Sequence, residues 1–288
     1  MKLQTYLGII NSISNNCYQN GQLSKRKNYF AKKNSLKTLF DIGDKNEGTI
    51  ILCEVGPDYT CIATADEQHK LHSLRYFSTS LDEIDANELS LHSFQKLVVH
   101  SAYPEALIVP HKYFDEQNSK QWLKEMFGFN ESPQFHNAIN EWQVTVAYTL
   151  PETIDNQFTN AVYWHVYATA LKNCFGAQNQ INIHFSPKCF RVMVKKGSAL
   201  QLCQTYPYTT PLDVIYYLLN ICQKFNLSQN ATHLSLSGLI EKDSALYKEL
   251  HQYFSDLSFN QSAGTSQLNE DYPAHYFTSV YQLVACAL

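Results

Sequence analysis

The chain has 288 residues, of which 44% are hydrophobic, 17% charged and 13% aromatic. This composition is that of a globular protein with room for one large domain or two medium ones, and it excludes a disordered chain. Residues 1–40 carry seven of the 22 basic residues and no acidic one, so the rest of the chain is acidic and the net charge is −4. An acidic body lacks the basic footprint that phosphate binding needs, so we expect no nucleic-acid partner.

The eight cysteines form no Cys-x-x-Cys pair and, with the histidines, no zinc-site spacing. Several stand in apolar runs, where a free thiol behaves as a small hydrophobe. We therefore predict a cytoplasmic protein with reduced thiols and no metal site. No stretch approaches the roughly eighteen apolar residues of a membrane-spanning helix, so membrane insertion is not expected.

The N-terminal part, residues 1–46, is polar and basic without a sustained hydrophobic period, and it predicts a poorly ordered arm. Whether that arm is an interaction tail or an unstructured leader stays open. Hydrophobic periodicity then predicts strands and helices in alternation. Strands are expected over 48–56, 59–66, 71–78, 96–102, 105–111 and 142–151, and helices over 88–97, 117–127, 152–165 and 167–174.

The second half repeats this order of elements. Strands are expected over 181–186, 189–195, 199–206 and 232–240, and helices over 211–226, from about 244, and over 274–285. Thr210 is the predicted N-cap of the long helix, with Pro211 at its first position and Asp213 three residues after the cap. The common order indicates an internal duplication. We predict an α/β fold of two domains, 47–165 and 166–288, with the last helix packing back on the first domain.

Several segments resemble the superfamily of actin, Hsp70-type chaperones and sugar kinases. They are VYWHVYATAL, ALQLCQTYPY, TTPLDVIYYLL, THLSLSGLI and PAHYFTSVYQLVACAL. From about Ser35 onward the chain is similar to a bacterial family of unknown function assigned that fold. The resemblance implies two ribonuclease-H-like domains around a nucleotide cleft, in which three loops hold ATP and its magnesium ion.

The first of these loops carries an acid two residues before a glycine. In this chain Glu54 and Gly56 fall at those positions, followed by Pro57 and Asp58. Pro57 removes an N–H that a phosphate cradle would use, and Glu has a longer arm than the usual Asp. The match is partial, and a plain β-turn is the competing interpretation.

The second loop, acidic and glycine-rich in the superfamily, reads His184-Phe185-Ser186-Pro187-Lys188-Cys189-Phe190-Arg191 here. The acids that would serve magnesium and the glycines that let backbone approach phosphate are both missing. A new phosphate clamp could form here only if the side chains of His184, Lys188 and Arg191 converged. The competing interpretation is that they are charges that face the solvent.

The third loop, a glycine pair between a strand and a helix, keeps Gly238 after Ser237. The same glycine would suit any strand-to-helix turn. Isolated histidines such as His100, His184 and His233 are interpreted as structural residues. Tyr206, Tyr208, Tyr216 and Tyr217 are interpreted as packing or interface residues.

These patterns favour a non-catalytic actin-like protein that acts by protein binding or self-association, with no catalytic residue and no cofactor. The alternative is an ATP-binding or weakly ATPase member with a rebuilt phosphate site, which would bind ATP and magnesium. Its candidate cleft residues are Glu54, Gly56, Asp58, His184, Lys188 and Gly238. A third interpretation is an assembly component of the kind found in pilus or secretion machines.

Overall fold

The computed structural model describes residues 38–44, 47–84, 94–128, 132–158, 160–174, 178–260, 268 and 271–287. Residues Leu36–Leu288 form one compact unit, which is the part discussed below. Most of the predicted N-terminal arm and most of the helix predicted over 88–97 lie outside the described residues.

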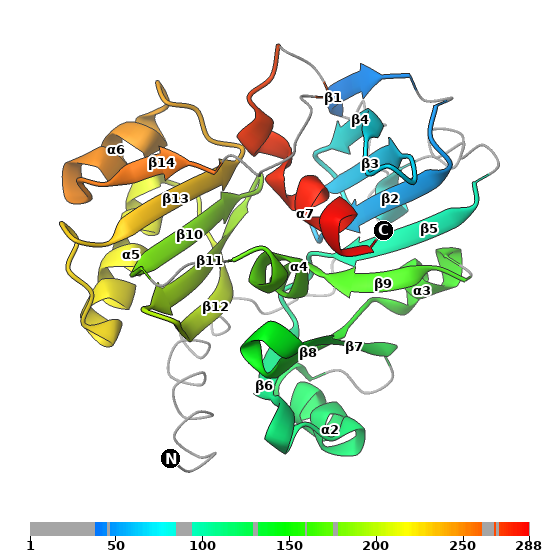
Figure 1. Ribbon diagram of the computed structural model, residues 1–288, viewed down its shortest axis with the longest axis horizontal. Coiled ribbons are helices and arrows are strands. Elements are labelled where there is room, and N and C mark those ends of the chain that lie inside the picture. Colours follow the sequence, from blue (N-terminus) through cyan, green and yellow to red (C-terminus); the bar gives the residue numbers. More distant parts are fainter. Residues whose placement is uncertain are drawn as a thin grey trace, which may run out of the picture. The chain divides into compact units, whose positions relative to one another are not determined.

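The first sheet has six strands in the order β1-β4-β3-β2-β5-β9 (Figure 1). Its strands are β1 (Thr38–Gly43), β2 (Ile50–Val55), β3 (Thr60–Ala65), β4 (Leu71–Phe77), β5 (Lys96–Ser101) and β9 (Val162–His165). The strands β2, β3 and β4 form an antiparallel meander, whereas β5 and β9 run parallel to β2. The edge strand β1 pairs antiparallel with β4.

The second sheet has five strands in the order β12-β11-β10-β13-β14. Its strands are β10 (Gln180–Phe185), β11 (Cys189–Lys196), β12 (Ala199–Pro207), β13 (His233–Gly238) and β14 (Leu257–Phe259). Again the first three strands form an antiparallel meander and the last two run parallel to the first. Apart from β1, the two sheets have the same order and directions, as the repeated pattern of the sequence predicts.

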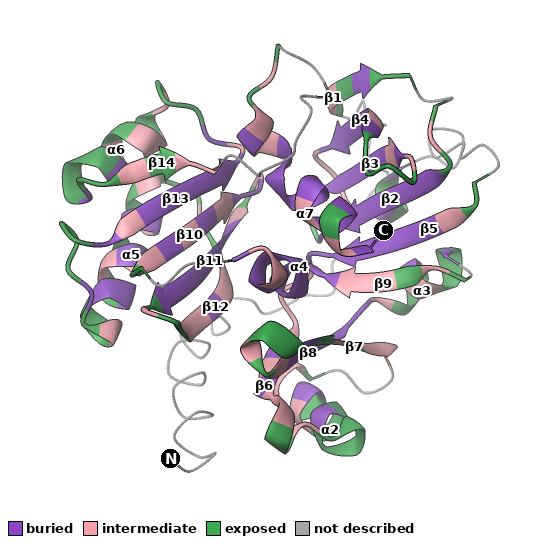
Figure 2. Ribbon diagram, viewed as in Figure 1, coloured by how far each residue is buried: buried purple, intermediate pink, exposed green. Residues whose placement is uncertain are grey.

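Side-chain alternation gives the second sheet two different faces. On β10, Ile181, Ile183 and Phe185 are buried, and the polar Asn182 and His184 between them point to the other face. The apolar face packs against helix α5 (Pro211–Phe225). There the ring centroids of Phe190 of β11 and Tyr217 of α5 are 6.0 Å apart. In the first sheet β2 is buried along its whole length, the pattern of a strand covered on both faces (Figure 2).

Helix α5 begins and ends as its sequence predicts. The Thr210 hydroxyl accepts from the Asp213 N–H at 3.3 Å, and the Asp213 carboxylate accepts from the Thr210 N–H at 2.7 Å, which completes a capping box. Asn226 ends the helix in the left-handed conformation. The next helix, α6 (Ala245–Tyr253), contacts α5 and precedes β14.

A small third sheet and a helix are inserted between β5 and β9. The sheet has the order β6-β8-β7, formed by β6 (Ala106–Pro110), β7 (Gln134–Ile139) and β8 (Val144–Thr149). Helix α2 (Glu116–Phe127) packs on it through a cluster that contains Leu107, Leu123 and Ala147. Asp115 caps this helix, and Gly128 ends it at the predicted residue, with φ +78°.

Two helices connect the large sheets. Helix α4 (Val166–Lys172) follows β9 directly, and α7 (Thr278–Ala287) follows the 3-10 turn Ala274–Phe277 near the end of the chain. Helix α7 contacts α4, β2 and β13, so the last helix reaches elements of both sheets (Figure 1).

The structure corrects two predicted ranges. The helix predicted over 152–165 ends early: α3 covers Glu152–Gln157, and Val162–His165 form β9, because this β-branched and aromatic segment pairs with β5. Within the predicted arm, Thr38–Gly43 form β1, where Ile42 is buried and Phe40 packs edge-on against Tyr76. Over the described part of the chain, no helix is long and apolar enough to cross a membrane.

Candidate functional site

Two hairpin turns occupy equivalent places in the two sheets. Gly56–Tyr59 joins β2 to β3 and Ser186–Cys189 joins β10 to β11, and each has proline at its second position. The first N–H of each turn donates to the carbonyl of its fourth residue, at 3.0 Å in the first and 2.9 Å in the second. The superfamily's first two phosphate loops occupy these positions. Here one N–H of each turn is already used internally and a second is removed by proline, so neither turn forms an anion cradle.

Glu54 stands at the end of β2 with its carboxylate inside the protein, 3% exposed. Its Oε1 accepts from the Tyr59 hydroxyl at 2.7 Å. Its Oε2 accepts from His100 Nδ1 at 2.7 Å and from the Ser279 hydroxyl at 2.5 Å. The Glu54 carboxylate therefore accepts hydrogen bonds from three side chains, which belong to the first turn, β5 and α7. In the resemblance described above, the acid at this position would serve a metal ion or a water molecule.

The chain places these partners by simple register. Because β2 and β5 are parallel neighbours, His100 is the residue beside Glu54. The other ring nitrogen, Nε2, lies 2.9 Å from the Thr169 hydroxyl of α4, which also lies 3.3 Å from the Val166 carbonyl. If Thr169 donates to that carbonyl, its oxygen accepts from His100 Nε2–H while Nδ1–H serves Glu54. In this arrangement the His100 ring bridges the Glu54 carboxylate and the Thr169 hydroxyl.

Electrostatics favour the ionised carboxylate. Burial by itself raises the pKa of Glu54, but the attraction of His100 and His184 and the hydrogen bonds from His100 and Ser279 outweigh it, so the pKa falls from 4.5 to about 2. The neighbouring Tyr59 hydroxyl, buried beside this carboxylate, has its pKa raised well above the ordinary value of 10.0. Glu54 is a paired anion that holds elements together rather than a proton acceptor poised near neutral pH.

Gly56 has a local structural role. A Cβ at this position would lie 2.8 Å from the Tyr59 ring, which is 2% exposed and stacks on Tyr76 with ring centroids 5.3 Å apart. The glycine gives the Tyr59 ring the room to lie under its own turn and reach Glu54.

Asp58 and Lys188 occupy the same position in the two turns and lie near each other. Burial raises the pKa of Asp58, and the charge of Lys188 partly offsets that rise. Both carboxylate oxygens of Asp58 are buried without a hydrogen-bond partner among the described residues. Lys188 is exposed. The two predicted residues do converge, but they form a contact between turns rather than a pocket.

His184 is the counterpart of Glu54 in the second sheet, and it contacts β13 in the way that Glu54 contacts β5. Its Nδ1 lies 3.0 Å from the Ser237 hydroxyl, which is 3.2 Å from the Ile183 carbonyl. Burial and the positive charge of Arg191 lower the pKa of His184 from 6.5 to about 3, although Glu54 opposes the shift. His184 is therefore neutral at physiological pH and supplies no charge for a phosphate group.

Gly238 has φ +77°, and a Cβ there would lie 2.1 Å from the Phe185 carbonyl oxygen. That carbonyl accepts from the Leu239 N–H at 2.9 Å, so the end of β13 folds closely over the end of β10. Close backbone approach explains this glycine without a bound adenosine.

The candidate residues thus gather around the ends of β2, β10 and β13, as the alternative interpretation requires, but the Glu54 carboxylate already has three side-chain partners there. His100, Thr169 and Ser279 complete the cluster, and the sequence did not single them out as partners of Glu54. For His100 the adjacent parallel strands were a usable signal, whereas Ser279 lies 225 residues from Glu54 and has no local signal. Arg191, interpreted as solvent-facing, is 8% exposed. Among the described residues, no three His, Cys, Asp or Glu side chains are grouped to hold a metal ion.

Solved structures show which fold this is. One similar structure is a Bacteroides thetaiotaomicron protein with an actin-like ATPase fold and unknown function, at a TM-score of 0.66 and 14% identity, covering 82% of this chain and 95% of that one. Another is a chain of the PilM–PilN type IV pilus biogenesis complex, at a TM-score of 0.56 and 11% identity, covering 82% and 98%. At such identities the likeness concerns the fold alone, which is the actin-like arrangement of two ribonuclease-H-like units.

No curated protein has a sequence that matches this chain. A family model does match, over residues 46–257, which include the inserted sheet and every strand of the two large sheets except β1 and most of β14. The chain therefore belongs to the family described as Protein of unknown function (DUF3822).

Proposed function

We propose that this protein is a non-catalytic member of the actin-like fold that acts by binding another protein or by self-association. The observation that carries this proposal is the environment of Glu54, the acid that stands two residues before the glycine of the first loop. It is buried and already accepts hydrogen bonds from Tyr59, His100 and Ser279. Phosphoryl transfer in this class depends on positioned charge and metal ions, and a carboxylate with three protein partners does not supply them.

Thermal unfolding of the full chain with and without Mg-ATP tests the proposal. A ligand at 100 times its Kd stabilises the folded state by about 2.7 kcal/mol, which raises the Tm of a protein of this size by several degrees. We expect no change in Tm at millimolar Mg-ATP beyond the change that MgCl₂ alone produces.

The matched control is Glu54→Gln, which keeps the size of the side chain and removes its charge. A Tm rise with Mg-ATP that disappears in Glu54→Gln, or on adding EDTA, would show that the carboxylate serves nucleotide and would overturn the non-catalytic proposal. Gly238 is unsuitable for this purpose, because any side chain there meets the Phe185 backbone.

The convergence of the candidate residues favours a second function, an ATP-binding member with a rebuilt phosphate site. Asp58 and Lys188 lie near each other, and Glu54 is close enough to His184 for each to shift the other's pKa. This function requires the buried cluster to open. It predicts a Tm rise with Mg-ATP that Lys188→Ala reduces, and the thermal unfolding experiment described above therefore separates it from the first proposal.

Two observations support the part of the proposal that concerns protein binding: a complex that contains a similar fold, and exposed apolar side chains on α5. The PilM–PilN complex shows that an actin-like fold can belong to a protein assembly. On α5, Leu212 is 60% and Tyr216 is 63% exposed, four residues apart and so on one face of the helix. Light scattering over a range of protein concentrations separates the two modes: a rising mass indicates self-association, and a constant monomer indicates a different partner.

We also propose a reducing, cytoplasmic location. The seven cysteines in the described part of the chain are free thiols, and five of them are buried in apolar surroundings. Thiol titration of the native protein from cells should find them reduced, and a native disulfide would contradict the proposal.

A further inference from the structure

The second sheet turns a polar face toward α4 and α7. Asn182 and His184 of β10, Arg191 of β11 and Ser237 of β13 lie on this face, opposite the apolar side chains that meet α5. Buried sheet faces are normally apolar, because a polar group removed from water without a partner is destabilising. A polar face beneath two helices therefore needs an explanation.

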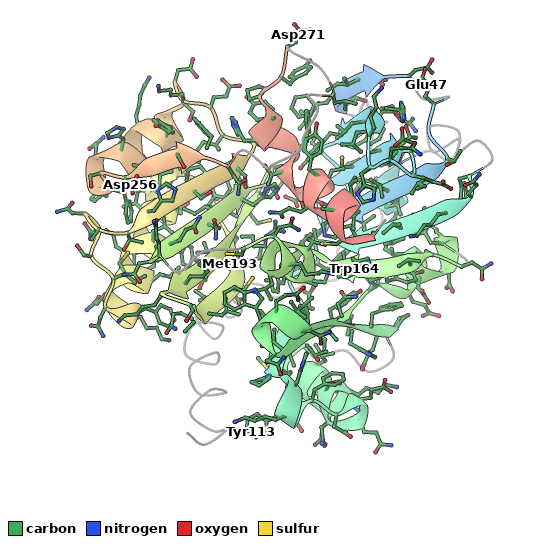
Figure 3. The ribbon with its side chains drawn as sticks, in the orientation of Figure 1. Glu47, Tyr113, Trp164, Met193, Asp256 and Asp271 are labelled. Carbon is green, nitrogen blue, oxygen red and sulfur yellow. The ribbon has the colours of Figure 1, made fainter. Side chains whose placement is uncertain are left out.

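A pocket of about 110 Å³ lies between this face and the two helices. Met193 of β11, labelled in Figure 3, is one of the side chains that line it. Eight polar side chains line it, among them Asn182, His184, Arg191, Ser237 and Gln282. No Asp or Glu is among the described residues that line the pocket.

Arg191 is the charged group of the pocket. It is 8% exposed, and its guanidinium makes no hydrogen bond and no ion pair within the described part of the chain. The neighbouring His184 is neutral near pH 7, so it adds no second positive charge beside the arginine. An isolated buried guanidinium is strongly unfavourable, so the geometry calls for a negative partner in the pocket.

Gln282 of α7 contributes a second unpartnered group. Its Oε1 is buried without a hydrogen-bond donor among the described residues. By contrast, Asn182 is engaged, because it donates to the Cys174 sulfur at 3.4 Å and accepts from Gln180 at 2.8 Å. A ligand that satisfies the pocket must therefore accept from a guanidinium and donate to an amide oxygen.

The size of the pocket limits that ligand. A cavity of about 150 Å³ in another protein holds benzene, and nucleotide-sized ligands need pockets of roughly 300–1,000 Å³. A space of about 110 Å³ accepts a molecule of only a few non-hydrogen atoms. Inorganic hydrogen phosphate has that size, several acceptor oxygens and one hydroxyl donor.

We propose that this pocket is a binding site for a small oxyanion of the size of hydrogen phosphate, held by the Arg191 guanidinium and the Gln282 side chain. The oxyanion lies between the second sheet and the helices α4 and α7, so binding joins elements that are distant in sequence. The site adjoins the cluster around Glu54, because His184 belongs to both, and it requires no nucleotide.

Calorimetric titration of the full chain with inorganic phosphate, at constant ionic strength in chloride buffer, tests the proposal. We expect saturable binding that is at least about tenfold weaker in Arg191→Met and measurably weaker in Gln282→Leu, because each change removes a hydrogen-bonding group of the site. Lys248→Met, which removes an exposed lysine of α6, should leave the affinity unchanged. Sulfate, which has no hydroxyl near pH 7, should bind more weakly than phosphate.

A second measurement separates a binding role from a structural one. Without phosphate, Arg191→Met should raise the Tm, because it removes a buried charge that has no partner. Phosphate should raise the Tm of the wild type and not that of Arg191→Met beyond the general effect of sulfate. Absence of phosphate binding by the wild type, or equal affinities for the wild type and Arg191→Met, would overturn the proposal.

Discussion

The β2–β3 hairpin of the first sheet and the β10–β11 hairpin of the second have the same register and the same proline turn, but opposite polar contents. Glu54 lies opposite Cys61 in the register of the first hairpin, and His184 lies opposite Arg191 in that of the second. In the first hairpin an anion has three partners, two of them from β5 and α7. In the second, a cation has no partner within the described residues.

The difference shows what the duplicated backbone determines and what it leaves to the side chains. Strand order, turn length and the neighbours across each strand pair are the same in both sheets. The hydrogen bonding of the polar side chains differs between the two sheets, because it depends on which helix residues pack opposite them. One hairpin has become part of the protein's framework, while the other keeps a polar group available for a ligand. Four changes would break or sharpen this contrast.

The largest effect is expected from His100→Ala. It removes the His100 hydrogen bond from the buried Glu54 carboxylate, and a buried charged group that loses a partner lowers stability by about 3 kcal/mol or more. The counterpart change His184→Ala removes a neutral ring with one side-chain hydrogen bond and should lower stability by about 1–3 kcal/mol. Urea unfolding of both variants measures the difference, and equal losses would contradict the contrast.

Gly238→Ala should lower the free energy of unfolding by about 3 kcal/mol or more. The new Cβ would meet the Phe185 carbonyl oxygen at 2.1 Å, in addition to the strain of a positive φ. Gly128→Ala is the matched control, since its φ is also near +78° but no atom lies within 4 Å of the new Cβ. It should lower stability by only about 1–2 kcal/mol, the contribution of φ alone. Similar losses in chemical denaturation would show that φ, not the contact, decides.

Acid should weaken the two hairpins in different pH windows. The lowered pKa of His184, about 3 against 6.5, contributes stability above pH 6.5 that is lost as the pH falls toward 3, because the unfolded chain binds the proton first. At pH 5 that loss is about 2 kcal/mol. The lowered pKa of Glu54, about 2 against 4.5, contributes stability above pH 4.5 that is lost only between pH 4.5 and 2.

Unfolding free energies measured from pH 7.5 to pH 4 check these windows. His184→Gln should flatten the upper part of the curve, and Glu54→Gln should change only the part below pH 4.5. Some upper slope will remain in His184→Gln, because burial also lowers the pKa of His165 to about 3. A variant Glu54→Gln that alters the slope near pH 6 would show that the assignment of the two windows is wrong.

The smallest effect is expected from Ser101→Ala. Ser101 is the counterpart of Gly238, and its hydroxyl is buried without a partner among the described residues. Removing it should change stability by less than about 1 kcal/mol, or raise it slightly. A thermal melt suffices, and a large loss would reveal a partner for the hydroxyl.

The sequence predicts elements well where local signals agree. The capping residues of α5 and the glycine end of α2 lie where expected. It fails where pairing decides: β7 has the polar sequence QFHNAI, β14 has three residues, and β9 follows a helical pattern but joins β5. None of these three strands has a periodicity that distinguishes it from a loop or helix without its neighbours.

The candidate site was predictable to the same extent. Glu54 and His184 stand at equivalent positions of the two hairpins and lie close together, as do Asp58 and Lys188; the repeated pattern of the sequence gives the equivalence, and the packing of the two sheets gives the proximity. The burial of Arg191 was not predictable, because a short hairpin gives no information about the helices that cover its face. The partners Thr169 and Ser279 come from those helices, and only the three-dimensional packing identifies them.

The hydrogen bond between Ser279 and Glu54 also bears on the order of folding events. It joins residues 225 positions apart, so β2 is synthesised long before the helix that completes its surroundings. Contacts of such separation require a long loop to close, which slows folding, so we expect this one to form late. Until α7 docks, the first sheet holds an incompletely satisfied charge, and its strands remain open to exchange with solvent. Arrival of the last helix is therefore expected to be the step that commits both sheets to the native topology.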